Sequence, residues 1–114
     1  MAVTLEAARK EVTQILKNHK FVQLSANWCP DCVYTKNIFQ KHGVYDKFYF
    51  FEIGNYTRGS KDFDNYYLAF QEAAKKKNLP LIFADGKFVG TEHTIHDWEN
   101  KGTLEKEFKN LGLL

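Results

Sequence analysis

The order of helical and extended patterns constrains the fold of this chain more than any other feature. Residues 4–19 carry apolar side chains at helical spacing, and residues 20–26 form a short apolar strand. Residues 29–42 then predict a second helix that ends at Gly43, and residues 47–53 predict an aromatic strand. Two strands joined by a helix run parallel, with a right-handed crossover.

The second half of the chain adds one more helix, a hairpin and a last helix. Ser60 is a suitable N-cap for a helix rich in aromatic residues, and Thr103 is a suitable N-cap for the final helix. Strands at residues 81–84 and 87–89 are joined by an Asp-Gly pair, which is a strong hairpin signal. The sequence therefore predicts an α/β fold, with a mixed four-stranded sheet flanked by helices on both faces.

The length and composition fit a single domain that spans residues 1–114. Hydrophobic residues make up 44% of the chain and charged residues 26%, which is enough to build one core. The formal net charge of +2 is too small to indicate a nucleic-acid surface, and no apolar run approaches the roughly 20 residues that span a bilayer. The start of the chain lacks the apolar core of a signal peptide. We expect a cytoplasmic monomer with no nucleic-acid or membrane partner.

The two cysteines of the chain, Cys29 and Cys32, lie three positions apart where a strand gives way to a helix. The free amide groups and the dipole of a helix N-terminus favour negative charge, so a thiolate at Cys29 is stabilised there. Pro30 suits the first helical turn, because it has no N–H to leave unpaired. Cys32 lies about one turn further on, close enough to attack a sulfur bound to Cys29. This arrangement favours a redox pair that exchanges disulfides.

Two other interpretations of the cysteines are open at this point. Free cysteines are often inert core residues, although a buried pair needs no Trp-Cys-Pro-x-Cys arrangement. The pair could also be half of a zinc site completed by His93 and His96, but the gap is long and the His-x-x-His spacing misses the usual finger pattern. We expect no metal.

Three motifs give the chain a resemblance to a known family. The "WCPDC" that follows a strand, the later "NLPLIF" and the "GKFVGTE" beyond it resemble the glutaredoxins of the thioredoxin superfamily. The closest similarity is to divergent fungal dithiol glutaredoxin-like proteins, and it covers nearly the whole chain. The resemblance implies a thioredoxin-like fold and a thiol–disulfide oxidoreductase that uses glutathione as its reductant, with disulfide-containing proteins or peptides as partners.

The resemblance also assigns functions to individual residues. Cys29 would be the exposed nucleophile and Cys32 the resolving thiol, and the two would form the redox-active disulfide. Pro80 would be a cis-proline that faces the cysteines. Leu79 would offer its backbone to a substrate peptide or to glutathione as a short added strand. Trp28 would form an apolar wall beside the cysteines and contact the substrate, with burial in the core as the alternative.

The chain departs from the glutaredoxin pattern around the cysteines. Asp31 replaces the usual Tyr, and Ala26 stands where many members have a Lys. A carboxylate at position 31 would oppose thiolate formation at Cys29, unless it points into water and has little effect. Gln23 occupies the position of the buried Asp of thioredoxins and cannot titrate.

The glutathione site departs from the family pattern as well. Glutaredoxins typically have Gly-Gly-x-Asp-Asp after the last strand, whereas this chain has Gly-Thr-Glu-His-Thr, so the acidic pair is lost. Glu92, His93 and Thr94 occupy this stretch. Lys76 and Lys77 lie where the family often holds the glycine carboxylate, and the alternative is that they are a solvated basic helix end. We therefore expect an oxidoreductase with weak glutathione recognition. The alternative is a thioredoxin-related WCPDC protein that is recycled by thioredoxin reductase and does not use glutathione.

Overall fold

The computed structural model describes residues 2–114 and contains four strands and five α-helices. No helix in this part of the chain is long and apolar enough to cross a membrane. The elements follow one another as α1 (Leu5–Asn18), β1 (Phe21–Ser25), α2 (Pro30–Lys41), the 3₁₀ turn η1 (Tyr45–Lys47), β2 (Phe48–Glu52), the 3₁₀ turn η2 (Ile53–Asn55), α3 (Lys61–Ala74), β3 (Leu81–Ala84), β4 (Lys87–Gly90), α4 (Glu92–Lys101) and α5 (Leu104–Leu111).

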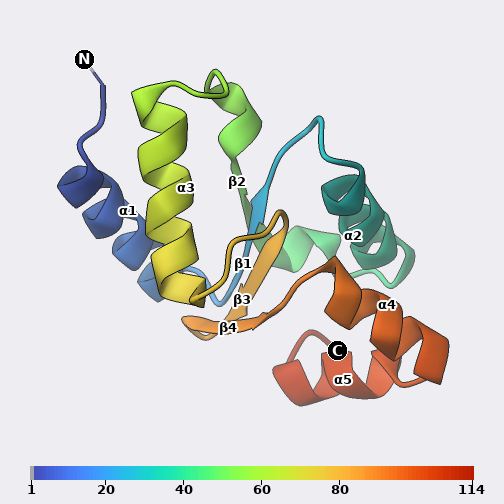
Figure 1. Cartoon of the computed structure of the whole chain (residues 1–114). Coiled ribbons are helices and arrows are strands. Elements are labelled where there is room, and N and C mark those ends of the chain that lie inside the picture. Colours follow the sequence, from blue (N-terminus) through green and yellow to red (C-terminus); the bar gives the residue numbers. More distant parts are fainter. Residues whose placement is uncertain (1) are drawn as a thin grey trace.

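The four strands form one mixed sheet in the order β2-β1-β3-β4 (Figure 1). β1 and β2 are parallel and are joined through α2, as the strand–helix–strand pattern predicts. β3 runs antiparallel to β1, and β4 runs antiparallel to β3. This is the thioredoxin-like topology that the sequence resemblance implied.

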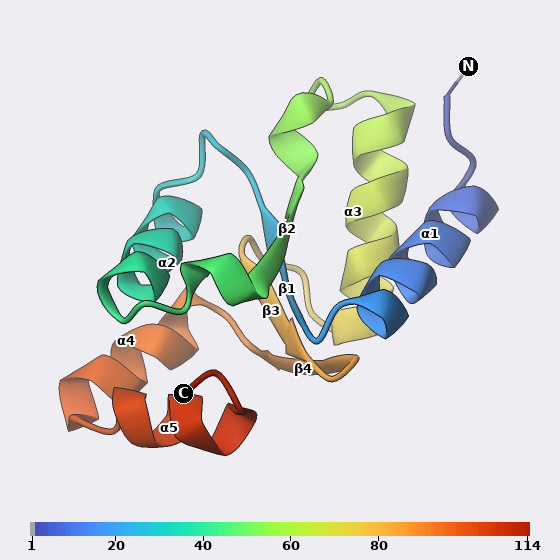
Figure 2. The ribbon, with the colours of Figure 1, turned by 180° about the vertical axis from the view of Figure 1, so that it is seen from behind.

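Helices cover both faces of the sheet, so the chain has two hydrophobic layers. Figures 1 and 2 show α1 and α3 side by side on one face, with α2, α4 and α5 on the other. One apolar cluster joins α1 and α3 to the sheet and includes both cysteines. The second cluster joins the sheet to α2, α4 and α5 and is rich in aromatic rings, with Phe39 stacked on Phe48 at a centroid distance of 4.2 Å.

Several local signals in the sequence have the predicted structure. Thr4 and Ser60 are N-caps, and their hydroxyl oxygens accept hydrogen bonds from the amides of Ala7 and Phe63 at 3.0 and 3.2 Å. The hairpin turns at Asp85 and Gly86, where both residues have positive φ angles of 52° and 76°. Such a turn matches the twist of the strands that it joins, which explains the Asp-Gly pair.

Two features of the C-terminal region differ from the sequence prediction. The helix α4 was not predicted, because its apolar pattern is sparse and only Glu92 and Ile95 are buried in it. It begins with a capping box in which Thr91 and Thr94 satisfy each other's amides. Thr103 is the N-cap residue of α5 as predicted, but its side chain makes no N-cap hydrogen bond and instead donates to the carbonyl oxygen of Trp98.

We expect Phe39→Ala to lower the free energy of unfolding by about 3–5 kcal/mol, because it opens a cavity in a fully buried aromatic layer. Val33→Ala on the same helix is the matched control, since Val33 is 43% exposed and should change stability by less than about 0.5 kcal/mol. Urea denaturation measures both variants. Equal losses in the two variants would contradict this description of the core.

Candidate active site

The sulfur of Cys29 is part of the cap of α2. Cys29 is the N-cap residue, and its Sγ accepts a hydrogen bond from the backbone amide of Cys32 at 3.3 Å. Pro30 occupies the first helical position, where its missing N–H costs nothing. The Cys29 thiol also donates a hydrogen bond to the carbonyl oxygen of Leu79 at 3.7 Å. The helix N-terminus therefore meets the sulfur directly, and it stabilises negative charge there.

Both cysteines are free thiols, and Cys29 is less accessible than the resemblance implied. Cys29 is only 7% exposed, so the expectation of an exposed nucleophile is wrong: its sulfur lies between the first turn of α2 and the Leu79 carbonyl. Cys32 is completely buried. Burial raises the pKa of the Cys32 thiol far above its ordinary value, and the neighbouring Cys29 raises it further. Cys32 is thus a protonated thiol at neutral pH.

The loop before β3 is held against the cysteine pair by a buried carboxylate. The Leu79–Pro80 peptide bond is cis, Pro80 is buried and Leu79 is half-buried. Asn78 Nδ2 donates to the carbonyl oxygen of Pro80 at 2.9 Å and to Glu92 Oε1 at 2.8 Å. Because Glu92 is the first residue of α4, this side chain ties the loop to the start of that helix.

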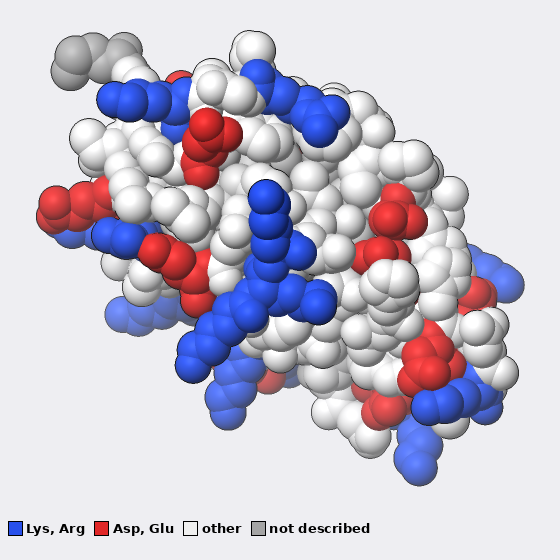
Figure 3. Space-filling view, in the orientation of Figure 1, with Lys and Arg blue, Asp and Glu red and all other residues white. Residues whose placement is uncertain are grey.

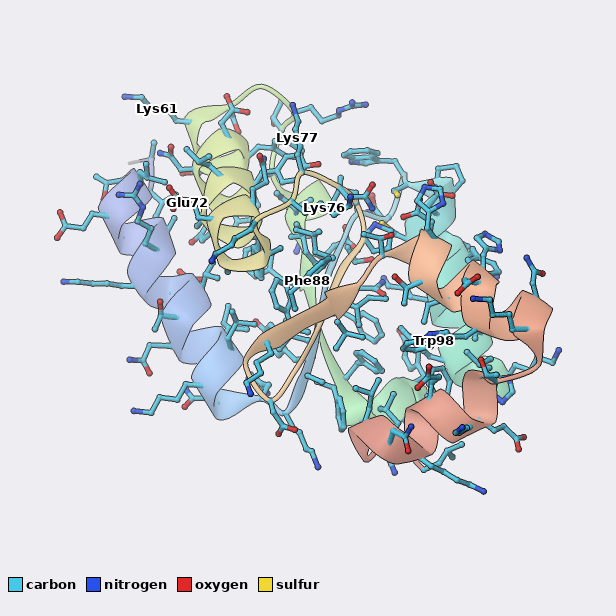
Figure 4. All side chains as sticks on the ribbon, turned by 60° about the horizontal axis from the view of Figure 1, so that its bottom comes forward. Lys61, Glu72, Lys76, Lys77, Phe88 and Trp98 are labelled. Carbon is cyan, nitrogen blue, oxygen red and sulfur yellow. The ribbon has the colours of Figure 1, made fainter. Side chains whose placement is uncertain are left out.

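Of the residues expected to contact glutathione, some are hydrogen-bonded within the protein and others are exposed on its surface. Glu92 is 5% exposed and bonded to Asn78, and Thr94 Oγ1 accepts from the Thr91 amide at 3.1 Å. His93 is exposed, with its Nε2 3.3 Å from Glu92 Oε2, and Lys77 is exposed after the end of α3 (Figure 4). An open hollow of about 310 Å³ has His93 and Thr94 in its lining, but neither cysteine lines it.

Trp28, which directly precedes Cys29, belongs to a group of aromatic side chains. The Trp28 indole is 41% exposed, so burial in the core is excluded. It stacks on Phe63 at a centroid distance of 6.3 Å, and the Arg58 guanidinium carbon lies 4.3 Å from the ring centroid. Phe63 in turn contacts Tyr67 edge-on. Burial raises the pKa of the Tyr67 phenol, and Tyr67 packs against the apolar cluster that contains both cysteines.

The loop in front of the cysteines is fixed by Glu52. Its Oε2 accepts hydrogen bonds from the backbone amides of Asn27 and Gly54 at 2.7 and 3.0 Å, and its Oε1 lies 3.5 Å from Lys36 Nζ. The sequence analysis identified neither Glu52 nor Asn78. A lone polar residue at a strand end gives no sign of its distant hydrogen-bond partner. The one available signal was that Glu52 is the single charged residue at the end of an otherwise aromatic strand.

The zinc interpretation receives no support from the residues that it needs. Within residues 2–114, no three His, Cys, Asp or Glu side chains come together as a metal site. The His96 ring stacks on Tyr34 at a centroid distance of 3.9 Å, and His93 pairs with Glu92. Asp31 lies in the first turn of α2 and is exposed. This position fits the alternative given above, in which the carboxylate points into water and has little effect on the Cys29 thiolate.

Comparison with known proteins assigns the family. Residues 20–89 match the family model for glutaredoxin. The chain is also 46% identical over 101 residues to Glutaredoxin-8 of Saccharomyces cerevisiae (strain ATCC 204508 / S288c), which covers 89% of this chain and 91% of the yeast protein. The chain belongs to the glutaredoxin family. It is accordingly a thiol–disulfide oxidoreductase, as the cysteine pair predicted.

Solved structures agree with this assignment. The solution structure of a yeast dithiol glutaredoxin superposes with a TM-score of 0.85 at 43% identity, covering 96% of this chain and 98% of that one. A buckwheat glutaredoxin in complex with glutathione has the same fold, with a TM-score of 0.75 at 20% identity over 96% of this chain and 94% of that one. The similarity to divergent fungal dithiol glutaredoxins is therefore confirmed.

We expect iodoacetamide at neutral pH to modify Cys29 of the reduced protein and to leave Cys32 unmodified. Cys32 is buried, and its raised pKa keeps it protonated, whereas the alkylating agent reacts with thiolates. Peptide mapping by mass spectrometry measures the two sites, and Cys29→Ser should show almost no labelling. Faster modification of Cys32 than of Cys29 would contradict the assigned geometry.

Proposed function

We propose that this glutaredoxin reduces protein disulfides and glutathione mixed disulfides by a two-thiol route, and that it recognises glutathione weakly. Cys29 is the attacking thiol and Cys32 the resolving thiol. The observation that carries this assignment is the difference between them: the Cys29 sulfur is the cap of a helix, whereas Cys32 lies beneath it with no exposed surface. We also propose that the protein acts as a monomer in the cytoplasm, where thiols are kept reduced.

The chemistry proceeds in two exchanges. The Cys29 thiolate attacks one sulfur of a substrate disulfide, which forms a mixed disulfide and releases the other sulfur as a thiolate that takes up a proton. Cys32 then attacks Cys29 Sγ, the bond to the substrate breaks, and the proton of Cys32 ends on the departing thiol. The substrate gains two electrons, and the Cys29–Cys32 pair is oxidised to a disulfide. Two molecules of glutathione, which become glutathione disulfide, return the pair to its reduced form.

The loop around Leu79 is suited to hold an extended substrate at the sulfur. Its carbonyl oxygen lies 3.7 Å from Cys29 Sγ, so a strand paired with Leu79 would place its own sulfur beside Cys29. Trp28 and Arg58 lie on the open side of the pair and offer an apolar and a cationic contact. These contacts do not depend on glutathione and fit peptide disulfides in general.

The internal contacts of Glu92 and Thr94 support weak glutathione binding. Glutathione's amino group needs an anionic or polar acceptor, but Glu92 is buried against Asn78 and Thr94 caps its own helix. A cationic surface for carboxylates is retained, since Lys76 and Lys77 are exposed between α3 and β3 (Figure 4). Figure 3 shows Lys and Arg side chains gathered over this part of the face. The chain thus keeps one half of a glutathione site and lacks the other.

We expect the double variant His93→Asp/Thr94→Asp to lower the KM for glutathione roughly tenfold, because a new hydrogen bond to the charged amino group is worth about 1.5 kcal/mol. One carboxylate oxygen of Asp at position 94 can still accept from the Thr91 amide, so the capping box of α4 should be retained while the second oxygen is free for the ligand. Steady-state reduction of a glutathionylated peptide measures the effect, and Asp97→Asn, on the exposed side of α4, is the control. If the KM of the wild type for glutathione already equals that of the variant, the proposal that the protein recognises glutathione weakly is wrong. Efficient recycling by thioredoxin reductase, with none by glutathione, would favour the alternative function.

A further inference from the structure

A buried polar layer lies beneath Cys32, and the exchange chemistry described above makes no use of it. Gln23, Ser25, Thr35 and Cys32 all have zero exposed surface. Alternate residues of a strand point to the same face, so Gln23 and Ser25 project together from β1. Residues three apart on a helix also share a face, so Thr35 lies one turn beyond Cys32 on α2. Fold and register thus bring three neutral polar side chains into one buried layer with Cys32, whose carbonyl oxygen is bonded to Thr35.

The hydrogen bonds of this layer orient Ser25. Thr35 Oγ1 lies 2.9 Å from Gln23 Oε1 and 3.0 Å from the Cys32 carbonyl oxygen, and its single proton is shared between these acceptors. Gln23 Nε2 donates to Ser25 Oγ at 3.5 Å. The Ser25 hydroxyl is thereby an acceptor toward Gln23, and its own proton is free to point at Cys32. Burial has the largest effect on the pKa of the Cys32 thiol and raises it, whereas hydrogen bonds from the backbone of Ala26 and from the Ser25 hydroxyl lower it.

The layer contains no group that could remove a proton from Cys32. β1 has the sequence FVQLS, in which no residue titrates. The titratable groups that face Cys32 are Cys29 on its own helix and Tyr67 from α3, and both are weak acids. Asp31 is adjacent in sequence but exposed. A buried thiol without a base can be helped by donors that stabilise its negative charge as the proton leaves, and Ser25 is the side-chain donor that acts beside the backbone of Ala26.

We propose that Ser25, oriented by Gln23 and Thr35, is a positioning residue for the resolving step: its hydroxyl donates a hydrogen bond to the Cys32 sulfur while that sulfur attacks the mixed disulfide. This inference rests on the two-thiol route proposed above. The covalent balance of the step is unchanged, since the sulfur–sulfur bond to the substrate breaks, the Cys29–Cys32 bond forms and the proton of Cys32 ends on the departing thiol. Ser25 contributes a hydrogen bond and exchanges no atoms.

The test is a single-turnover measurement of resolution. Reduced protein is mixed with a glutathionylated peptide, quenched with acid at intervals and analysed by mass spectrometry for the mixed disulfide and for the Cys29–Cys32 disulfide. We expect Ser25→Ala to slow conversion of the first species into the second about tenfold, with the pH profile of this step moved to higher pH. The rate of Cys29 alkylation stays at the wild-type value, because the hydrogen bonds of Cys29 Sγ are made with the Cys32 amide and the Leu79 carbonyl oxygen.

Three further variants make the result specific. Ser25→Thr keeps the hydroxyl and should resolve within about threefold of the wild type. Gln23→Leu removes the donor that orients Ser25 and should slow resolution in the same direction, and it serves as the test if Ser25→Ala does not fold. Thr13→Ala removes an exposed hydroxyl on α1 and should change nothing.

Two outcomes would overturn the inference: resolution in Ser25→Ala at the wild-type rate and pH dependence, or resolution in Ser25→Thr as slow as in Ser25→Ala. Failure of the proposed function would look different. In that case the wild-type protein itself would accumulate a mixed disulfide and would never form the Cys29–Cys32 disulfide.

Discussion

The hydrogen bond from the Cys32 amide to the Cys29 sulfur determines what the rest of this site can do. It makes the sulfur the cap of α2, so the charge that develops on a thiolate meets the free amides of the first turn. The same bond fixes the second cysteine one turn deeper, beneath the first. Since both partners are set by the backbone path from β1 into α2, the strand–helix junction itself assigns different environments to two identical thiols.

Two buried or half-buried carboxylates keep this junction in place, and neither takes part in the exchange chemistry. Glu52 holds the loop before the cysteines by accepting from two backbone amides. Glu92 holds the opposite loop through Asn78, which also bonds the carbonyl oxygen of Pro80. A carboxylate used in this way is unavailable to a ligand, so the contact that supports the Leu79–Pro80 loop is also the one on which the proposed weak recognition of glutathione rests.

The sequence contained enough information for the sheet, for the helices α1 to α3 and for the cysteine pair, because each depends on local signals. Caps at Thr4 and Ser60, the Asp-Gly turn and the Cys-Pro-x-Cys spacing all act within a few residues. It did not reveal α4, whose few buried residues give no clear helical period. The burial of Cys29 was also missed, because it depends on a loop fifty residues away.

Hydrogen bonds between polar residues that are far apart in the sequence could not be predicted. Gln23 was recognised only as a position that cannot titrate, whereas its value lies in bonds to Ser25 and Thr35 that join a strand to a helix. Glu92 was expected to be a ligand residue, and nothing in the sequence indicated that its side chain would be bonded to Asn78 on the loop before β3. Such pairings follow from the tertiary fold and leave no pattern in the linear chain.

Trapping of the mixed disulfide tests the unequal environments of the two thiols most directly. The single variants Cys32→Ser and Cys29→Ser are each incubated with a glutathionylated peptide, and the adducts are located by mass spectrometry. The account predicts that Cys32→Ser accumulates an adduct on Cys29, whereas Cys29→Ser remains unmodified over the same time. Adduct formation on Cys32 in the second variant, at a rate equal to that of the first, would contradict it.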